Sequence, residues 1–287
     1  MSMFQYAITG ALDKLPEMWP ATLRGSLEEI CKKAADIGYT GLELQICDPQ
    51  RYDADEMNRL AKDYGLSYAA IATGQELVQH GLWMTSDDPA VRRASIDKLK
   101  LHIDLCEKLG AILIVGSMRQ HVPDYKNPEK YLQYHDEAVW ELSDYAAKHN
   151  VMIVVENITV HISNWINTIR ETMNYVQRVN RDNVRLHLDT YSMLMEDNDI
   201  AGSYRLCADK LEYVHFTDGS RLYPGGSNVD FKAHMHSLVD IGYQGWISIE
   251  CRPYPDDVTC ARFSYEYLQA MEKIVEIERY RREHPLI

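Results

Sequence analysis

Four side chains of types that bind divalent metal ions stand at the ends of four apolar runs in the second half of the chain. The runs are residues 151–156, 184–189, 211–215 and 246–250, and they end at Glu156, Asp189, His215 and Glu250. Short apolar runs of this kind are typical of buried β-strands. Three carboxylates and one imidazole are a donor set suited to a divalent cation. The pattern therefore predicts a metal site built from four strand ends.

The rest of the chain supplies the elements that would bring these residues together. Further strands are predicted over residues 4–9, 41–46, 67–73 and 111–116. Helices are predicted over residues 23–37, 54–64, 89–109, 128–149, 165–180, 201–209, 231–241 and about 257–282. Eight alternating strand and helix units predict an α/β fold, a (β/α)₈ TIM barrel, with residues 1–287 as a single domain.

Glycines mark the junctions where several predicted helices give way to the next strand. Examples are Gly38, Gly110 and Gly242, and a glycine there accepts the left-handed backbone that ends a helix. In a TIM barrel the active site lies at the opposite face, at the carboxyl ends of the strands. All four metal candidates fall at those ends. Glu43 would add a carboxylate near the same face, either as a substrate contact or as part of the scaffold.

The charge balance restricts the class of ligand. The 287 residues contain 43 acidic and 30 basic side chains, which gives a net charge of −13. Such a field repels phosphate backbones, so nucleic acid is not the expected substrate. Small neutral or metal-chelated ligands fit this charge, although it is equally compatible with a role in solubility alone.

Composition also sets expectations for the compartment. No apolar run approaches the roughly 18 residues of a membrane span, and no secretory leader is recognisable at the first residues. We therefore expect a cytoplasmic protein with no membrane partner. The six cysteines contain no C-x-x-C pair and most lie in apolar segments, so we expect buried, reduced thiols.

The motifs around the candidate residues, taken in order, resemble those of a known family. They are Gly41-Leu-Glu-Leu, Ala70-Ile-Ala-Thr-Gly-Gln, Leu188-Asp-Thr-Tyr-Ser-Met, His215-Phe-Thr-Asp-Gly-Ser-Arg and Ser248-Ile-Glu-Cys-Arg-Pro. Each motif alone is weak, but the ordered set is specific and extends over nearly the whole chain. The chain resembles the xylose-isomerase-like barrel superfamily, in particular the ketose 3-epimerase group that includes D-tagatose 3-epimerase and 5-keto-L-gluconate epimerase.

This resemblance implies that Glu156, Asp189, His215 and Glu250 hold one divalent metal ion, typically manganese (Mn²⁺), although Mg²⁺, Co²⁺ or Zn²⁺ could take its place. It implies a small-molecule sugar substrate whose ketone is polarised, so that the neighbouring C–H bond becomes acidic. Glu156 and Glu250 would be the two catalytic bases, one on each face of the sugar. Arg221 resembles the family arginine that contacts substrate oxygens. The expected activity is isomerisation or epimerisation of a keto-sugar or related polyol through an enediolate.

Further substrate contacts are expected from residues near the same face. Tyr6 would either form a wall of the sugar pocket or fill the barrel, and His161 lies after the fifth strand. His187, two residues before Asp189, is either a group behind the ligands or a packed core histidine, and it is not included among the ligands. The loop of residues 75–88 would act as a lid or pack on the surface. Arg119 and His121 near the mouth have no assigned role.

Three recognition positions differ from the family pattern. Ser192 stands where the group usually has a substrate-binding histidine, and Ile162 replaces a second glutamate. Residues 226–229 read Gly-Ser-Asn-Val, where the 5-keto-L-gluconate relatives have Gly-x-Gly-His. We therefore expect either an unusual sugar or a different reaction at the same metal. The alternative is a lyase or dehydratase that acts on an oxo-sugar, an oxo-inositol or a 3-oxo-glycoside, with His161 or His121 protonating the leaving group.

An endonuclease and a catalytically inactive barrel are less consistent with the sequence. A zinc-dependent endonuclease of the same barrel superfamily would need more metal-binding histidines and a basic groove. A barrel that binds metal without catalysis would also retain the four ligands. The resemblance makes a homodimer or homotetramer plausible, with the charged and aromatic segment from Asp257 onward as a candidate interface.

Overall fold

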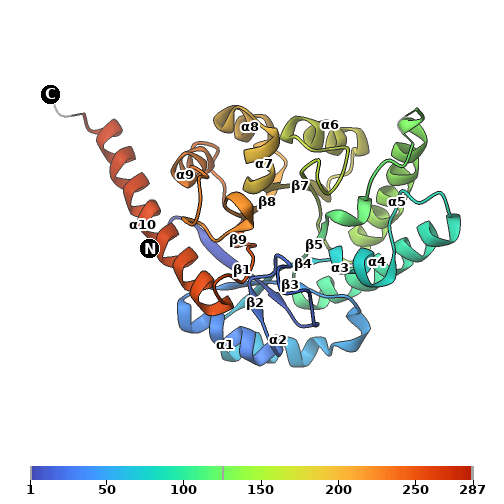
Figure 1. Ribbon diagram of the computed structural model, residues 1–287, viewed down its shortest axis with the longest axis horizontal. Coiled ribbons are helices and arrows are strands. Elements are labelled where there is room, and N and C mark those ends of the chain that lie inside the picture. Colours follow the sequence, from blue (N-terminus) through green and yellow to red (C-terminus); the bar gives the residue numbers. More distant parts are fainter. Residues whose placement is uncertain (1, 125, 286–287) are drawn as a thin grey trace.

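Eight parallel strands close into a barrel in the computed structural model, which describes residues 2–124 and 126–285 (Figure 1). The strands are β1 (Gln5–Ala11), β3 (Gly41–Gln45), β4 (Ser67–Ala72), β5 (Ile112–Val115), β6 (Ile153–Glu156), β7 (Val184–Asp189), β8 (Leu211–Phe216) and β9 (Trp246–Ile249). Each pairs with the next, and β9 pairs with β1 to close the ring. A two-residue strand, β2 (Leu23–Arg24), extends the sheet beside the end of β1. The predicted TIM barrel is confirmed.

Helices surround the barrel, and all eight predicted helices are present (Figure 1). They are α1 (Leu27–Ile37), α2 (Ala54–Asp63), α4 (Pro89–Leu109), α5 (Pro128–Lys148), α6 (Ile169–Val179), α8 (Ile200–Cys207), α9 (Phe231–Asp240) and α10 (Asp257–Glu283). Two short helices that we did not predict, α3 (Gly74–His80) and α7 (Thr190–Glu196), follow β4 and β7. Three 3₁₀ turns complete the described elements: η1 (Pro49–Arg51), η2 (Ser117–Arg119) and η3 (Gly219–Arg221).

Local capping corrects the start of two predicted helices. Helix α1 begins at Leu27 rather than Leu23, because the Ser26 side chain accepts a hydrogen bond from the backbone of Glu29 and the Glu29 side chain returns the contact. Thr168 caps α6 in the same way. At the other end of α1, Gly38 has a φ of 117°, the left-handed conformation expected of that glycine.

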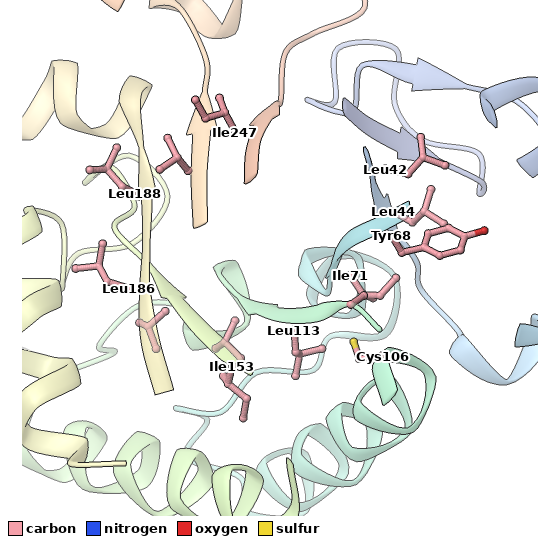
Figure 2. Packing of buried hydrophobic residues seen from close by; sticks show 14 of the residues in the cluster. Leu42, Leu44, Tyr68, Ile71, Cys106, Leu113, Ile153, Leu186, Leu188 and Ile247 are labelled. Atoms are coloured by element: carbon pink, nitrogen blue, oxygen red, sulfur yellow. The ribbon is translucent and has the colours of Figure 1, made fainter. Parts of the chain in front are cut away.

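The alternation of side chains along each strand divides the core into two layers. Residues such as Leu42, Leu113 and Leu186 point outward and pack against the surrounding helices (Figure 2). The side chains that point into the barrel are mostly small, such as Ala70. Tyr213 is a large exception among them. Near the carboxyl ends of the strands, inward positions are polar and buried, so the barrel is closed by a polar layer at that face.

Two further sequence expectations concern the cysteines and membrane spans. All six cysteines are buried and unpaired, as expected of reduced thiols. Within residues 2–124 and 126–285, no helix has the length and apolar character needed to cross a bilayer.

Candidate metal-binding active site

The four predicted metal ligands meet at the carboxyl-terminal face of the barrel. Glu156, Asp189 and His215 end or nearly end β6, β7 and β8, and Glu250 directly follows β9. His215 Nδ1 lies 3.9 Å from Asp189 Oδ2 and 3.7 Å from Glu250 Oε2. Donor atoms of Glu156 and His215 lie within 4.8 Å of each other. All four side chains are at most 9% exposed, so the cluster is largely shielded from water.

Glu43 fixes the orientation of His215 from behind. His215 Nε2 donates to Glu43 Oε2 at 2.7 Å, and the Tyr213 hydroxyl donates to the same oxygen at 3.0 Å. Glu43 is fully buried and does not line the cavity, which agrees with the scaffold alternative for this residue. A carboxylate that holds the second nitrogen of a histidine is the usual partner of a metal-binding imidazole.

The residues present fit a divalent cation. His215 Nδ1 has no hydrogen-bond partner among the described residues, although it faces two carboxylates. Burial lowers the pKa of His215, but the negative charges of Glu43 and Glu250 outweigh burial and raise it well above its usual value. The site therefore attracts positive charge, and a divalent ion would satisfy both the free nitrogen and the clustered carboxylates.

Arg119 holds the backbone of Glu156, and Gly116 leaves space for the Glu156 side chain. Arg119 is fully buried, and its guanidinium donates to the backbone carbonyls of Glu156 and Ile166. A Cβ on Gly116 would lie 2.5 Å from Glu156 Oε2, so only glycine leaves room for the carboxylate there. The pKa of Glu156 is raised to about 8, mainly by burial and also by the charges of Asp189 and Glu250, while the charge of His215 opposes the rise. Arg119 thus has a positioning role that the sequence did not indicate.

Arg221 reaches the same carboxylates from the turn after β8. Its Nη1 lies 2.5 Å from Glu250 Oε2 and 3.5 Å from Asp189 Oδ2, and its guanidinium lies 4.8 Å from the centroid of the Tyr191 ring. The backbone φ of Arg221 is 57°, a strained value for a residue other than glycine. The predicted arginine therefore lies in the site, in position to contact an anionic or hydroxyl oxygen.

Asp218 organises the turn that carries Arg221. Its fully buried carboxylate accepts hydrogen bonds from four backbone N–H groups, those of Gly219, Gly225, Ser227 and Val229, at 2.7–3.0 Å. We did not single out Asp218 from the sequence. The available signal was an aspartate directly before a glycine and serine segment, which is typical of a side chain that holds a turn together.

A cavity of about 290 Å³ opens beside the four ligands. One wall is polar and contains Glu156, His215, Arg221 and Glu250. The remaining walls are mainly apolar and contain Trp19, Pro20, Leu77, Val78, Ile114, Ile158 and Ile162. Gln45 connects the polar and apolar sides, because its amide donates to Glu250 Oε1 at 3.1 Å and its carbonyl accepts from the Trp19 indole at 2.6 Å.

The part of the expected lid that borders the cavity is helical. Gly74, Leu77 and Val78 of α3 line the cavity, whereas Met84, later in the same loop, is fully buried and donates its N–H to the Met118 carbonyl. The loop of residues 75–88 therefore contributes a wall at its start and a packed segment farther on.

The remaining predicted substrate contacts lie away from the cavity. Tyr6 is near the start of β1 rather than its end, points outward and donates to Glu272 of α10 at 3.1 Å, so the expectation of a sugar contact is corrected. His161 is exposed and does not line the cavity, although its neighbour Ile162 does. Ser192 is fully buried in α7, where its N–H donates to Asp189 Oδ1 at 3.0 Å. Neither His161 nor Ser192 contacts the cavity in this structure.

His187 lies immediately beside the ligands. Its ring centroid is 4.1 Å from that of His215, and the side chain is fully buried with neither ring nitrogen hydrogen-bonded within the described residues. Burial lowers the pKa of His187 well below its usual value, and the positive charges of His215 and Arg221 act in the same direction. Its donor atoms lie within 4.8 Å of those of Glu156 and His215.

Comparisons with known proteins agree with this fold and site. A family model described as a xylose isomerase-like TIM barrel matches residues 31–271. An L-ribulose 3-epimerase from Methylomonas sp. (strain DH-1) is 31% identical over 220 residues, which cover 76% of this chain and 75% of that protein. A ketose 3-epimerase from Arthrobacter globiformis is 28% identical over 221 residues, with coverage of 76% and 75%. A D-allulose 3-epimerase structure from Methylomonas sp. has a TM-score of 0.79 at 25% identity, covering 94% and 99% of the two chains.

The chain belongs to the xylose isomerase-like TIM barrel family. The relatives just described are named as sugar epimerases, so they agree with the expected isomerase or epimerase class and favour it over a lyase. The resemblance inferred from the ordered motifs is confirmed.

Proposed function

We propose that this protein is a divalent-metal-dependent epimerase of a keto-sugar. The observation that carries this proposal is the free Nδ1 of His215, which Glu43 holds toward Asp189 and Glu250 beside a sugar-sized cavity. Glu156, Asp189, His215 and Glu250 would hold the ion. We propose manganese, because three carboxylates and one imidazole form an oxygen-rich set that soft metals favour less. When bound, the ion would polarise the sugar ketone and stabilise negative charge on its oxygen.

The chain's own residues then move the proton. A carboxylate oxygen of one glutamate removes the hydrogen from the carbon beside the ketone, and the other glutamate returns a proton to the opposite face. Glu156 and Glu250 come from β6 and the end of β9, strands on different sides of His215, which suits a base on each face of one sugar. Arg221 would donate to a sugar oxygen and replace part of its contact with Glu250.

The apolar walls suggest the class of sugar. A hydroxyl buried against Ile158 or Ile162 without a partner would lose about 1–3 kcal/mol of binding free energy. We therefore propose a ketose with few hydroxyls on the part remote from the ketone, such as a deoxy-ketose. The Ile162 side chain stands where the family pattern has a glutamate, which supports a less polar substrate.

Hydrogen exchange in D₂O tests both parts of the proposal. The manganese-loaded protein is incubated with a ketohexose, its 6-deoxy counterpart, an oxo-inositol and a 3-oxo-glycoside. We expect an inverted product carrying one deuterium beside the ketone, with higher kcat/KM for the deoxy-ketose than for the ketohexose. Glu156→Gln and Glu250→Gln should each abolish exchange.

Three outcomes would contradict these statements. Loss of water or of an aglycone would show a lyase, and no exchange with any sugar of the panel would refute the epimerase. Preference for the fully hydroxylated ketohexose would refute only the substrate class.

We also propose that the protein self-associates. Helix α10 presents Ile274, Ile277 and Tyr280 as exposed large side chains, in keeping with the interface expected from the sequence.

A further inference from the structure

A second group of metal-binding side chains lies outside the sugar cavity, between β3, α3 and α4. Cys47 follows β3, and Glu76 and His80 lie one turn apart on α3. The Cys47 Sγ atom is 3.7 Å from His80 Nδ1 and 3.9 Å from Nε2, and His80 Nδ1 is 2.6 Å from Glu76 Oε2. Donor atoms of the three residues all lie within 4.8 Å of one another. The proposed catalytic ligands contain no sulfur, so this group has a different chemistry.

The surroundings of this group favour a cation. Glu76 is fully buried, and its second oxygen is held at 2.8 Å by Nε2 of His102, which is also fully buried. The Cys47 thiol is also buried, and its donor atom lies within 4.8 Å of donor atoms of Glu76 and His80. A divalent ion would compensate the buried carboxylate and stabilise the thiolate.

The distances suit a tetrahedral ion after a small adjustment. Zn–S and Zn–N bonds of about 2.3 and 2.0 Å imply a separation of about 3.5 Å between sulfur and nitrogen, close to the 3.7 Å between Cys47 and His80. The separation between His80 and Glu76 would have to lengthen to about 3.4 Å. The His80 side chain is 42% exposed, so it can move by this amount and leaves a side open for water as a fourth ligand.

We propose that Cys47, Glu76 and His80 bind a zinc ion, distinct from the metal of the active site, and that His102 positions Glu76. The site goes beyond the proposed function and does not depend on it. It would fasten α3 to the segment after β3. Because Leu77 and Val78 of α3 line the sugar cavity, a bound ion would fix that wall.

Cobalt gives a direct test, because a thiolate bound to Co²⁺ produces a charge-transfer band in the near ultraviolet that oxygen and nitrogen ligands do not. The full-length protein, kept reduced and oxygen-free, is titrated with Co²⁺ in the presence of Mn²⁺. We expect the band to grow to one sulfur-bound ion per chain and to disappear when Zn²⁺ is added. Glu156→Gln should retain it, which separates this site from the proposed catalytic one.

Matched variants assign the band to Cys47. Cys47→Ala should abolish it, whereas Cys207→Ala, which removes another fully buried thiol, should retain it. His80→Gln changes a half-exposed side chain and serves as a second test if Cys47→Ala misfolds by circular dichroism. It should weaken cobalt binding roughly tenfold or more, since losing a residue that merely orients a ligand already costs about 10–100-fold. Absence of the band in the wild type, its persistence in folded Cys47→Ala, or unchanged affinity in His80→Gln would overturn the proposal.

Discussion

At the scale of single residues, the chemistry of the active site depends on a histidine with one nitrogen occupied and the other free. Glu43 accepts from Nε2 of His215, so the lone pair of Nδ1 points toward Asp189 and Glu250. The same arrangement keeps the imidazole from rotating. Glu43 would therefore act on a bound metal through His215, and it does not line the cavity.

Glu43→Gln should weaken the metal site without removing any proposed ligand. The amide retains the shape of the side chain but loses the negative charge that orients and polarises His215, so we expect Mn²⁺ affinity to fall about 10–100-fold. Isothermal titration of the metal-free protein measures this change. Tyr213→Phe is the matched control, because it removes the other hydrogen bond to Glu43 and leaves the contact with His215. Equal Mn²⁺ affinity in Glu43→Gln and the wild type would refute this role.

At the scale of elements, strand ends position the proposed metal ligands, and a turn positions Arg221, the proposed substrate contact. The ligands project from hydrogen-bonded strands, whose register fixes them relative to one another. Arg221 does not lie on a strand. The Asp218 carboxylate holds its turn instead by accepting hydrogen bonds from four backbone N–H groups. The strained backbone at Ser220 and Arg221 persists because these bonds fix the turn.

Asp218→Ala should release this turn. Loss of the carboxylate leaves four backbone N–H groups without this partner, two of them in the buried residues Gly219 and Val229, so we expect the unfolding free energy to fall by about 1–3 kcal/mol. We also expect kcat/KM to fall at least tenfold while Mn²⁺ affinity changes little, because Arg221 moves and the strand ends do not. Urea unfolding, kinetics and metal titration measure the three effects. Asp230→Ala is the control, because it removes an exposed cap of α9 in the segment that follows the same turn. It should lower the unfolding free energy by only about 1 kcal/mol and leave kcat/KM unchanged. Normal kcat/KM in Asp218→Ala would contradict this account.

The short elements were also the hardest to predict. The strands could be predicted because each is a short, mainly apolar run, and four of these runs end at or beside a carboxylate or a histidine. Helices α3 and α7 have only seven residues each, too few for a helical repeat to stand out. Tyr6 was misplaced because side chains alternate along β1: Ala7 points into the barrel, so Tyr6 points outward toward the helices.

The roles of residues joined only by tertiary contacts could not be predicted from the sequence. Arg119 and Asp218 act through backbone groups that become neighbours only after folding. Cys47 and His102 come from different units of the barrel and share no recognisable spacing with α3. The catalytic ligands were identifiable because the barrel itself places equivalent strand ends together.

At the scale of the whole molecule, buried neutral histidines make the stability of the fold depend on pH. His135 of α5 is fully buried against α6, where its Nδ1 lies 2.5 Å from the Tyr175 hydroxyl. Burial, followed by the charge of Arg119, lowers the pKa of His135 to about 3. In the unfolded chain this pKa returns to about 6.5.

Acid should therefore destabilise the protein as the pH falls below about 6.5, because the unfolded state binds a proton that the folded state excludes. The contribution of His135 is fully present above that pH and decreases down to about 3. As the pH falls from 6.5 to 5, His135 should account for a loss of about 2 kcal/mol of unfolding free energy. Urea unfolding at several pH values should show a shallower pH dependence for His135→Gln than for the wild type. His121→Gln, at an exposed histidine, should retain the wild-type dependence. An unchanged slope in His135→Gln would contradict this assignment.

The pairing of β1 with β9 has a consequence for the order in which the protein becomes functional during synthesis. Glu250 follows the last strand, and that strand takes its place only when it hydrogen-bonds to both β8 and the first strand made. A growing chain that already contains Glu156, Asp189 and His215 therefore has neither a closed ring nor Glu250, the fourth proposed ligand. Tight capture of an ion by the proposed ligands would have to wait until nearly the whole chain has emerged, so a filled metal centre would mark a barrel whose two ends have met.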